Sequence, residues 1–302
     1  FKAGDRIGHG IALGEDIKRW IEKHETIIIP AGEWLEDLVW LWGVSISGEL
    51  NIQIYTEQIS KEIFTLAEKI YGKDENLTLE ILYEAYLKKF RLWHDNIFEN
   101  MREYCKDNNK QGCVENTHFC KYYNSKENVE QHWNADKVLC AYFCPVYYQR
   151  MRQSIVIHVD QEKYSLYKQV QEEILRIIAQ KGIFVEVNPT SNTAIGENRE
   201  LFMHHVLNLN NHGLVDEDPH EVMVTINSDD PLIFSTNCEN EMAYIYHALL
   251  SKGYSRERVI KWIDKVREYG LSSSFVKDIR TREKLIRELE IVLGQIEKRY
   301  KI

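Results

Sequence analysis

An α/β fold that contains part of a (β/α)8 barrel is predicted by three short strings in the sequence. They are Asp5-Arg6-Ile7-Gly8-His9-Gly10, Glu186-Val187-Asn188-Pro189-Thr190-Ser191-Asn192 and Asn227-Ser228-Asp229-Asp230-Pro231. Each string places polar residues directly after a short apolar run that is typical of a buried strand. The catalytic groups of a (β/α)8 barrel enzyme lie at the carboxyl ends of successive strands, and the three strings fit that arrangement.

Composition narrows the class of protein. The chain has 302 residues, 44% of them hydrophobic, and a formal net charge of −9. The chain has enough hydrophobic residues to form a packed core. Its negative net charge argues against a general nucleic-acid binder, which would need a basic face. A small uncharged nucleoside is not excluded. No apolar run approaches the ~18–20 residues that span a bilayer, so we expect a cytoplasmic protein with no membrane partner and with reduced cysteines.

Hydrophobic spacing predicts mostly helices between the strands. Apolar runs at 183–187 and 222–226 predict two further buried strands after the one that ends at His9. Helices are expected at 14–24, 57–70, 77–104, after Asp160, around 201–207, and at 239–251, 256–269 and 282–300, with a long polar loop at 105–135. The stretch 34–44 is apolar nearly all round, which indicates either a core helix or an assembly surface.

The spacing of the strings predicts the domain organisation. His9 and Glu186 are 177 residues apart, although a single βα step needs only about 30 residues. If the two strands are neighbours, most of the intervening chain is an insertion. We therefore expect residues 1–24 and 160–302 to form the barrel portion, with its last three strands and closing helices, and residues 25–159 to form a mainly helical inserted subdomain.

The first and third strings carry groups suited to catalysis. Gly8 and Gly10 let the backbone turn tightly beside a ligand, and His9 lies between them. Asp229 and Asp230 are adjacent carboxylates that need a cation or hydrogen-bond donors nearby. On an extended segment, one carboxylate can bind a metal while the other faces a substrate.

Structural roles for the same residues remain open. Buried histidines are often only hydrogen-bonded, and Asp-Asp-Pro is an ordinary turn that can also cap a helix. In the second string, Glu186, Ser191 and Asn192 are interpreted as structural residues near the site, because Ser and Asn readily bond to local backbone.

Together, the strings resemble the adenosine deaminase family over roughly residues 1–14 and 160–280. The resemblance implies one zinc ion, which lowers the pKa of a bound water so that the water attacks the purine at neutral pH. It implies catalytic roles for His9, which orients or deprotonates that water, and for Asp229, which also binds the zinc. Asp230 and Gly10 would bind the substrate, which is adenosine or an adenine nucleotide, and the products would be the inosine form and ammonia.

Part of the family pattern is absent. The family takes zinc ligands from a His-x-His pair and from a His-Ala-Gly-Glu string, and this sequence contains neither. Because a zinc site usually has three or four protein ligands, we expect the chain to be the carboxyl-terminal part of the enzyme. The remaining ligands are then expected in a missing amino-terminal part of the same protein. The large insertion resembles the enlarged deaminases of RADAR-type antiphage defence, which implies a homo-oligomer and a partner ATPase.

Other hypotheses remain. The barrel portion could be a degenerate scaffold, with the helical insertion serving as an oligomerisation or partner-binding module, or the barrel could serve another metal-dependent hydrolase. Five cysteines, with two histidines nearby, could hold a structural zinc or remain thiols. They are Cys105, Cys113, Cys120, Cys140 and Cys144. Only Cys140 and Cys144 have a spacing typical of zinc ligands.

Overall fold

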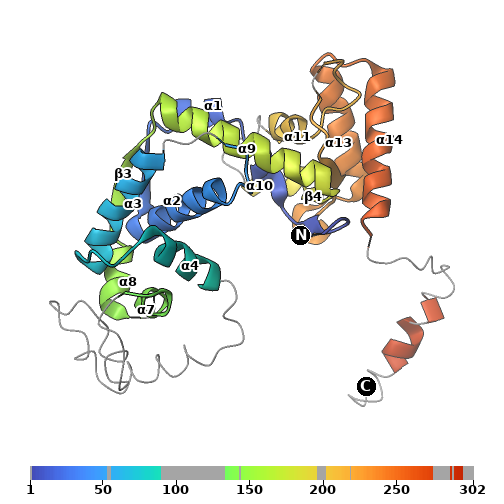
Figure 1. The fold of residues 1–302 in the computed structure, drawn as a ribbon. Helices are drawn as coiled ribbons and strands as arrows, with labels where there is room; N and C mark the ends of the chain where they lie inside the picture. Colours follow the sequence, from blue (N-terminus) through green and yellow to red (C-terminus); the bar gives the residue numbers. More distant parts are fainter. Residues whose placement is uncertain are drawn as a thin grey trace. The chain divides into compact units, whose positions relative to one another are not determined.

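A computed structural model describes residues 2–52, 56–89, 133–142, 144–195, 202–217, 219–274, 286–287 and 289–294. The chain divides into two compact units (Figure 1). Unit 1 comprises Phe1–Glu15 and Ile177–Ile302, and unit 2 comprises Asp16–Arg176. The boundaries predicted from the sequence differ from these by about ten to twenty residues. The interpretation of unit 2 as an insertion into a barrel stays a prediction.

Unit 1 is built on a parallel three-stranded sheet in the order β1-β4-β5. The strands are β1 (Arg6–Ile7), β4 (Phe184–Val187) and β5 (Met223–Ile226). Ile7 pairs with Val185, which also pairs with Val224 on its other side. The central strand is buried on both faces, as its run of apolar residues predicts for a parallel sheet. The expected neighbourhood of the three strands is therefore confirmed, and the chain is an α/β protein.

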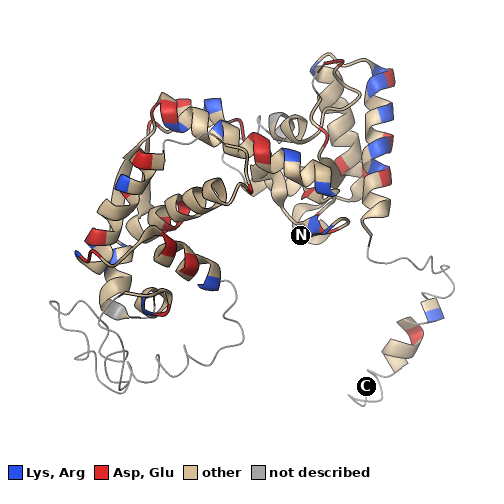
Figure 2. Cartoon of the chain, viewed as in Figure 1, with Lys and Arg blue, Asp and Glu red and all other residues tan. Residues whose placement is uncertain are grey.

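Helices flank this sheet. They are η1 (Gly10–Gly14), α10 (Pro189–Ile195), α11 (Phe202–Leu209), α12 (Pro231–Phe234), α13 (Cys238–Ser251) and α14 (Arg256–Ser272). α14 packs against β5 through Val259, Trp262 and Val266, which recur at helical spacing. Acidic and basic residues both lie along its exposed side (Figure 2), including the pair between Lys261 and Glu257. The sequence predicted α11, α13 and α14 but not α10.

Unit 2 is mainly helical. It contains α1 (Ile17–Lys23), α2 (Ala31–Ile46), α3 (Thr56–Tyr71), α4 (Leu79–Lys89), α7 (Ala135–Ala141), α8 (Pro145–Met151) and the start of α9 (Gln161–Lys181). α2 is the centre of its core, with Trp34, Leu38 and Trp42 all at most 9% exposed. The apolar stretch at 34–44 therefore forms a core helix, as one of the two interpretations expected.

A second sheet in unit 2 did not follow from the sequence analysis. β2 (Thr26–Pro30) pairs in antiparallel fashion with β3 (Ser154–His158), more than a hundred residues further along the chain. The residues of β2 form a short apolar run, and nothing nearby in the sequence identifies its partner. α7 and α8 were missed as well. The predicted helix beyond Lys89 and nearly all of the predicted loop at 105–135 lie outside the described residues.

None of the described helices is both long enough and apolar enough to cross a bilayer.

The packing of α2 on α4 depends on a glycine. A Cβ atom on Gly43 would collide with the ring of Tyr83. We therefore expect Gly43→Ala to destabilise the protein by about 1–2 kcal/mol, because overpacking outweighs the gain in helix propensity. Gly270 in α14 is the matched control, since a Cβ there meets no atom within 4 Å. Urea unfolding should show Gly270→Ala at least as stable as the wild type, and equal stability of the Gly43→Ala variant would contradict the packing.

Candidate active site

The parallel sheet of unit 1 brings the three strings to one edge. β1, β4 and β5 run in the same direction, so their carboxyl ends meet there. His9 follows β1, Asn188 follows β4, and Asp229 follows β5. The meeting of the three strings at one sheet edge, which fits the arrangement of a barrel site, is thus present in the structure.

His9 projects from a strained turn. Its φ is 52°, in the left-handed region, and its side chain is 59% exposed. Gly10, next to it, is buried, and a Cβ there would collide with Val185 of the central strand. The structure therefore explains Gly10 by close packing of the turn against the sheet. Its contact with a substrate stays a prediction.

Asn188 connects His9 to the sheet. Its side chain is almost fully buried, and its Nδ2 lies 3.2 Å from His9 Nδ1 and 3.3 Å from Glu186 Oε1. A carboxylate only accepts hydrogen bonds, so the amide NH2 group, and not the oxygen, faces Glu186. The second N–H of the same group then points at His9 Nδ1. Arg6, whose Nε lies 3.6 Å from Glu186 Oε2, adds a positive charge behind the carboxylate.

This arrangement selects one tautomer of His9. Nδ1 accepts a hydrogen bond from Asn188, so the neutral imidazole carries its proton on Nε2. His9 Nε2 lies 4.0 Å from Asp229 Oδ1. Asn188 Oδ1 is buried and has no hydrogen-bond partner among the described residues, which is the cost of turning the NH2 group toward Glu186 and His9. Asn188 belongs to the second string, but the sequence alone does not indicate its role. Its place directly after a buried strand was the available signal.

Ser191, from the second string, holds the side chain of Asp229 by a hydrogen bond. Asp229 too has a left-handed backbone, with φ of 57°, and Ser191 Oγ donates a hydrogen bond of 2.6 Å to its Oδ2. The side chain is 28% exposed. Oδ1 thus faces His9 while Oδ2 is bound to Ser191. Among the described residues, positive φ in a non-glycine residue occurs only at His9, Asp229 and Ser235, and such strain concentrates at functional sites.

Asp230 caps a helix. Its Oδ1 accepts hydrogen bonds from the backbone N–H groups of Leu232 and Ile233, at 3.0 and 3.2 Å, at the start of α12. This is the capping role that the Asp-Asp-Pro pattern left open. A substrate contact through Asp230 stays a prediction.

The start of α10 is locked by a buried carboxylate. Glu241 of α13 is 1% exposed and accepts hydrogen bonds from Thr190 N, Thr190 Oγ1 and Thr236 Oγ1. Asn192 Oδ1 adds a hydrogen bond of 2.9 Å from the backbone N–H of Asn188. Negative charge at a helix N-terminus is favourable. Glu241, which the sequence analysis did not single out, therefore fixes the segment that carries Asn188 and Ser191.

The described residues do not complete a metal site. No group of three or more His, Cys, Asp or Glu side chains converges among them. Asp229 Oδ1, beside His9, fits one corner of a zinc site, whereas such a site needs three or four protein ligands. Of the cysteines considered for a structural zinc, Cys105, Cys113, Cys120 and the side chain of Cys140 lie outside the described residues, and Cys144 is buried.

Comparison with known proteins supports the resemblance over much of unit 1. The adenosine deaminase family model matches residues 158–291. An adenine deaminase of Rhizobium meliloti (strain 1021) is 31% identical over 119 residues, which are 39% of this chain and 32% of the relative. An adenine deaminase of Sinorhizobium medicae (strain WSM419) is 33% identical over 119 residues, with the same shares.

The matched region has clear limits. The chain spans about a third of the length of these relatives, and the first string, with His9, lies outside residues 158–291. The second and third strings, with Asn188, Ser191, Asp229 and Asp230, lie within them. Through residues 158–291, the chain is therefore similar to the adenosine deaminase family.

Proposed function

We propose that this chain is the carboxyl-terminal part of a hydrolytic deaminase that removes the 6-amino group of an adenine ring as ammonia. The resemblance of the three strings to adenosine deaminases implies adenosine or an adenine nucleotide as the substrate. Free adenine is a further candidate substrate, because both relatives are named adenine deaminase. The observation that carries the proposal is the pairing of β1, β4 and β5, which gathers His9, Asn188 and Asp229 at one sheet edge.

The complete fold would be a (β/α)8 barrel. The three parallel strands follow one another in the order that a barrel requires, and β1 and β5 each have one side without a strand partner among the described residues. Further strands would extend the sheet from those sides. Assembly into a homo-oligomer with a partner ATPase remains a prediction from the resemblance to defence deaminases.

A zinc ion would be held partly by this chain. Asp229 would supply one ligand through Oδ1, because Ser191 already occupies Oδ2. The other ligands would come from outside the described residues. When bound, zinc lowers the pKa of a coordinated water and so supplies the nucleophile at neutral pH.

His9 has a definite place in this proposal. Its Nε2–H, set by the bond from Asn188 to Nδ1, is a donor aimed at the space beside Asp229 Oδ1. Neutral His9 would therefore orient the attacking water by donating a hydrogen bond to it, since Nε2 has no lone pair with which to take a proton. Of the two roles expected for His9, orientation is the one that the geometry favours.

The direct test of the proposal is ammonia release from adenosine, adenine and AMP by the complete protein that carries this chain, assayed with zinc added and by ultraviolet absorbance. Conversion of at least one of the three is expected. A protein that binds zinc and converts none of them would contradict the proposal. If it also bound no zinc, the scaffold hypothesis, with the helical residues as a partner-binding module, would be favoured.

The zinc assignment predicts different effects of two adjacent substitutions. Asp229→Ala should remove the bound zinc from the complete protein. Asp230→Asn should leave the zinc content unchanged, because Asn still caps α12. It should also weaken binding of the purine if Asp230 faces the substrate. Metal analysis of the purified variants checks the first effect, and normal zinc content in Asp229→Ala would rule out the ligand role.

His9→Ala should leave zinc bound but lower kcat by about 100-fold or more, as is typical when a group that handles the reacting water is lost. Folding should not suffer, because the side chain is largely exposed. Steady-state kinetics beside metal analysis separates the two effects, and unchanged kcat would make His9 a structural residue only.

Asn188 is proposed as the positioning residue for His9. In Asn188→Ala, His9 should lose its preference for the Nε2–H tautomer, which nitrogen-15 NMR of labelled histidine reports directly. Asn227, which follows the adjacent strand β5 and bonds to Thr225 at 3.3 Å, is the matched control. Asn227→Ala should leave the tautomer unchanged, and an unchanged tautomer in Asn188→Ala would refute the positioning role.

A further inference from the structure

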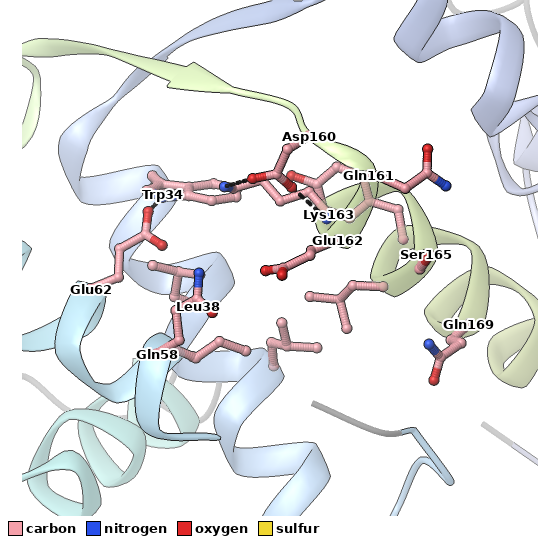
Figure 3. A pocket seen from close by; sticks show the side chains of 14 residues that line it. Trp34, Leu38, Gln58, Glu62, Asp160, Gln161, Glu162, Lys163, Ser165 and Gln169 are labelled. Carbon is pink, nitrogen blue, oxygen red and sulfur yellow. Dashed lines mark hydrogen bonds and ion pairs between the residues drawn. The ribbon is translucent and has the colours of Figure 1, made fainter. Parts of the chain in front are cut away.

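Unit 2 contains a cavity whose lining includes none of the residues at the strand ends of unit 1. Its volume is about 440 Å³, and its lining comes from α2, α3 and the first turns of α9, all within unit 2 (Figure 3). This volume falls in the range of small-molecule sites, which are typically about 300–1,000 Å³. The proposed deaminase site does not use it.

The floor of the cavity is apolar. Trp34, Leu38, Leu41 and Ile59 line it, and each is at most 8% exposed. The indole Nε1 of Trp34 donates a hydrogen bond of 2.8 Å to Glu62 Oε1, which satisfies the one polar atom of that side chain. The floor therefore offers apolar and aromatic surface to a ligand and no free hydrogen-bonding group of its own from these four residues.

The mouth of the cavity is acidic. It carries Glu62 from α3, and Asp160 and Glu162 from the start of α9. In Figure 3, the Glu162 side chain reaches from α9 toward the cavity, and Glu62 lies across it. Lys163 is the single basic residue of the lining and pairs with Asp160 at 3.6 Å. The charge of Lys163 is balanced by Asp160, so the carboxylates of Glu62 and Glu162 have no positive partner among the residues that line the cavity.

The lining shows the effect of this negative charge. The pKa of Tyr167, which also lines the cavity, is raised to about 12, first by burial and then by the nearby carboxylates of Asp37, Glu62 and Asp160. A further anion at the mouth would be repelled, whereas a cation would be attracted.

We propose that this cavity binds a small organic cation, with an apolar or aromatic body on the floor and a protonated amine at the mouth beside Glu62 and Glu162. The carboxylates of the mouth do not converge with a third ligand as a bare metal ion requires, since no such group exists among the described residues. An organic amine does not need three converging ligands. Its one ammonium group can bind beside two carboxylates, while its apolar body packs on the apolar floor.

Three probes of nearly the same shape test the proposal with the full chain: phenethylamine, 2-phenylethanol and 3-phenylpropionate. Isothermal titration calorimetry should rank them amine, alcohol, acid, with the amine about tenfold tighter than the alcohol, as two partly exposed charge contacts allow. Added salt should reduce that difference. No binding of the amine at millimolar concentration, or equal affinity for the three probes, would overturn the proposal.

Charge-neutral variants locate the site. Glu62→Gln with Glu162→Gln should reduce the affinity for phenethylamine to about that for phenylethanol, and Gln keeps an acceptor for the Trp34 indole. Glu57→Gln with Glu68→Gln is the control, since it removes two exposed carboxylates of α3 that do not line the cavity. Circular dichroism confirms that both double variants fold. An amine affinity that is unchanged in the first variant, or equally reduced in both, would place the cation elsewhere and refute the proposal.

Discussion

The parallel pairing of β4 between β1 and β5 is the constraint on which unit 1 depends. Ile7, Val185 and Val224 lie in register across three strands that are far apart in the sequence. A slip of one residue would exchange the two faces of β4, and it would also separate His9 from Asn188. The apolar residues of the strands fix the register of the sheet, and that register in turn fixes the geometry of the candidate site.

Several residues at this sheet edge adopt conformations that lower the stability of the folded protein. His9 and Asp229 adopt left-handed backbone conformations, which cost about 1–3 kcal/mol each, and the buried side-chain oxygen of Asn188 has no partner in the part of the chain that the structure describes. The buried carboxylate of Glu241 offsets part of this cost, because it accepts two hydrogen bonds from Thr190 at the start of α10 and one from Thr236. Strain and unsatisfied polar groups that gather at one edge, while the core beneath is regular, are typical of a site selected for function.

The local pattern of apolar and polar residues predicts two of the three strands of unit 1 and the polar residues that follow them. The apolar runs at 183–187 and 222–226 predicted β4 and β5, and their polar successors predicted the candidate site, because those signals lie within a few residues. The pairing of β2 with β3 could not be foreseen, since it joins segments that no local pattern relates. The same holds for Asn188 and Glu241, whose roles depend on His9 and Thr190 in other elements. The capping role of Asp230 was one of two interpretations that the sequence left open.

The assembly of the site from three strand ends is tested most directly by an NMR contact between His9 and Asn188. With both residue types selectively labelled, the account predicts a strong nuclear Overhauser effect between the His9 ring and the Asn188 side-chain amide, whose nitrogen lies 3.2 Å from His9 Nδ1. Its loss in a variant with a disrupted β1–β4 pairing would agree with the account. Absence of the contact in the folded wild-type protein would contradict it, because the strand order would then not bring the first string to the second.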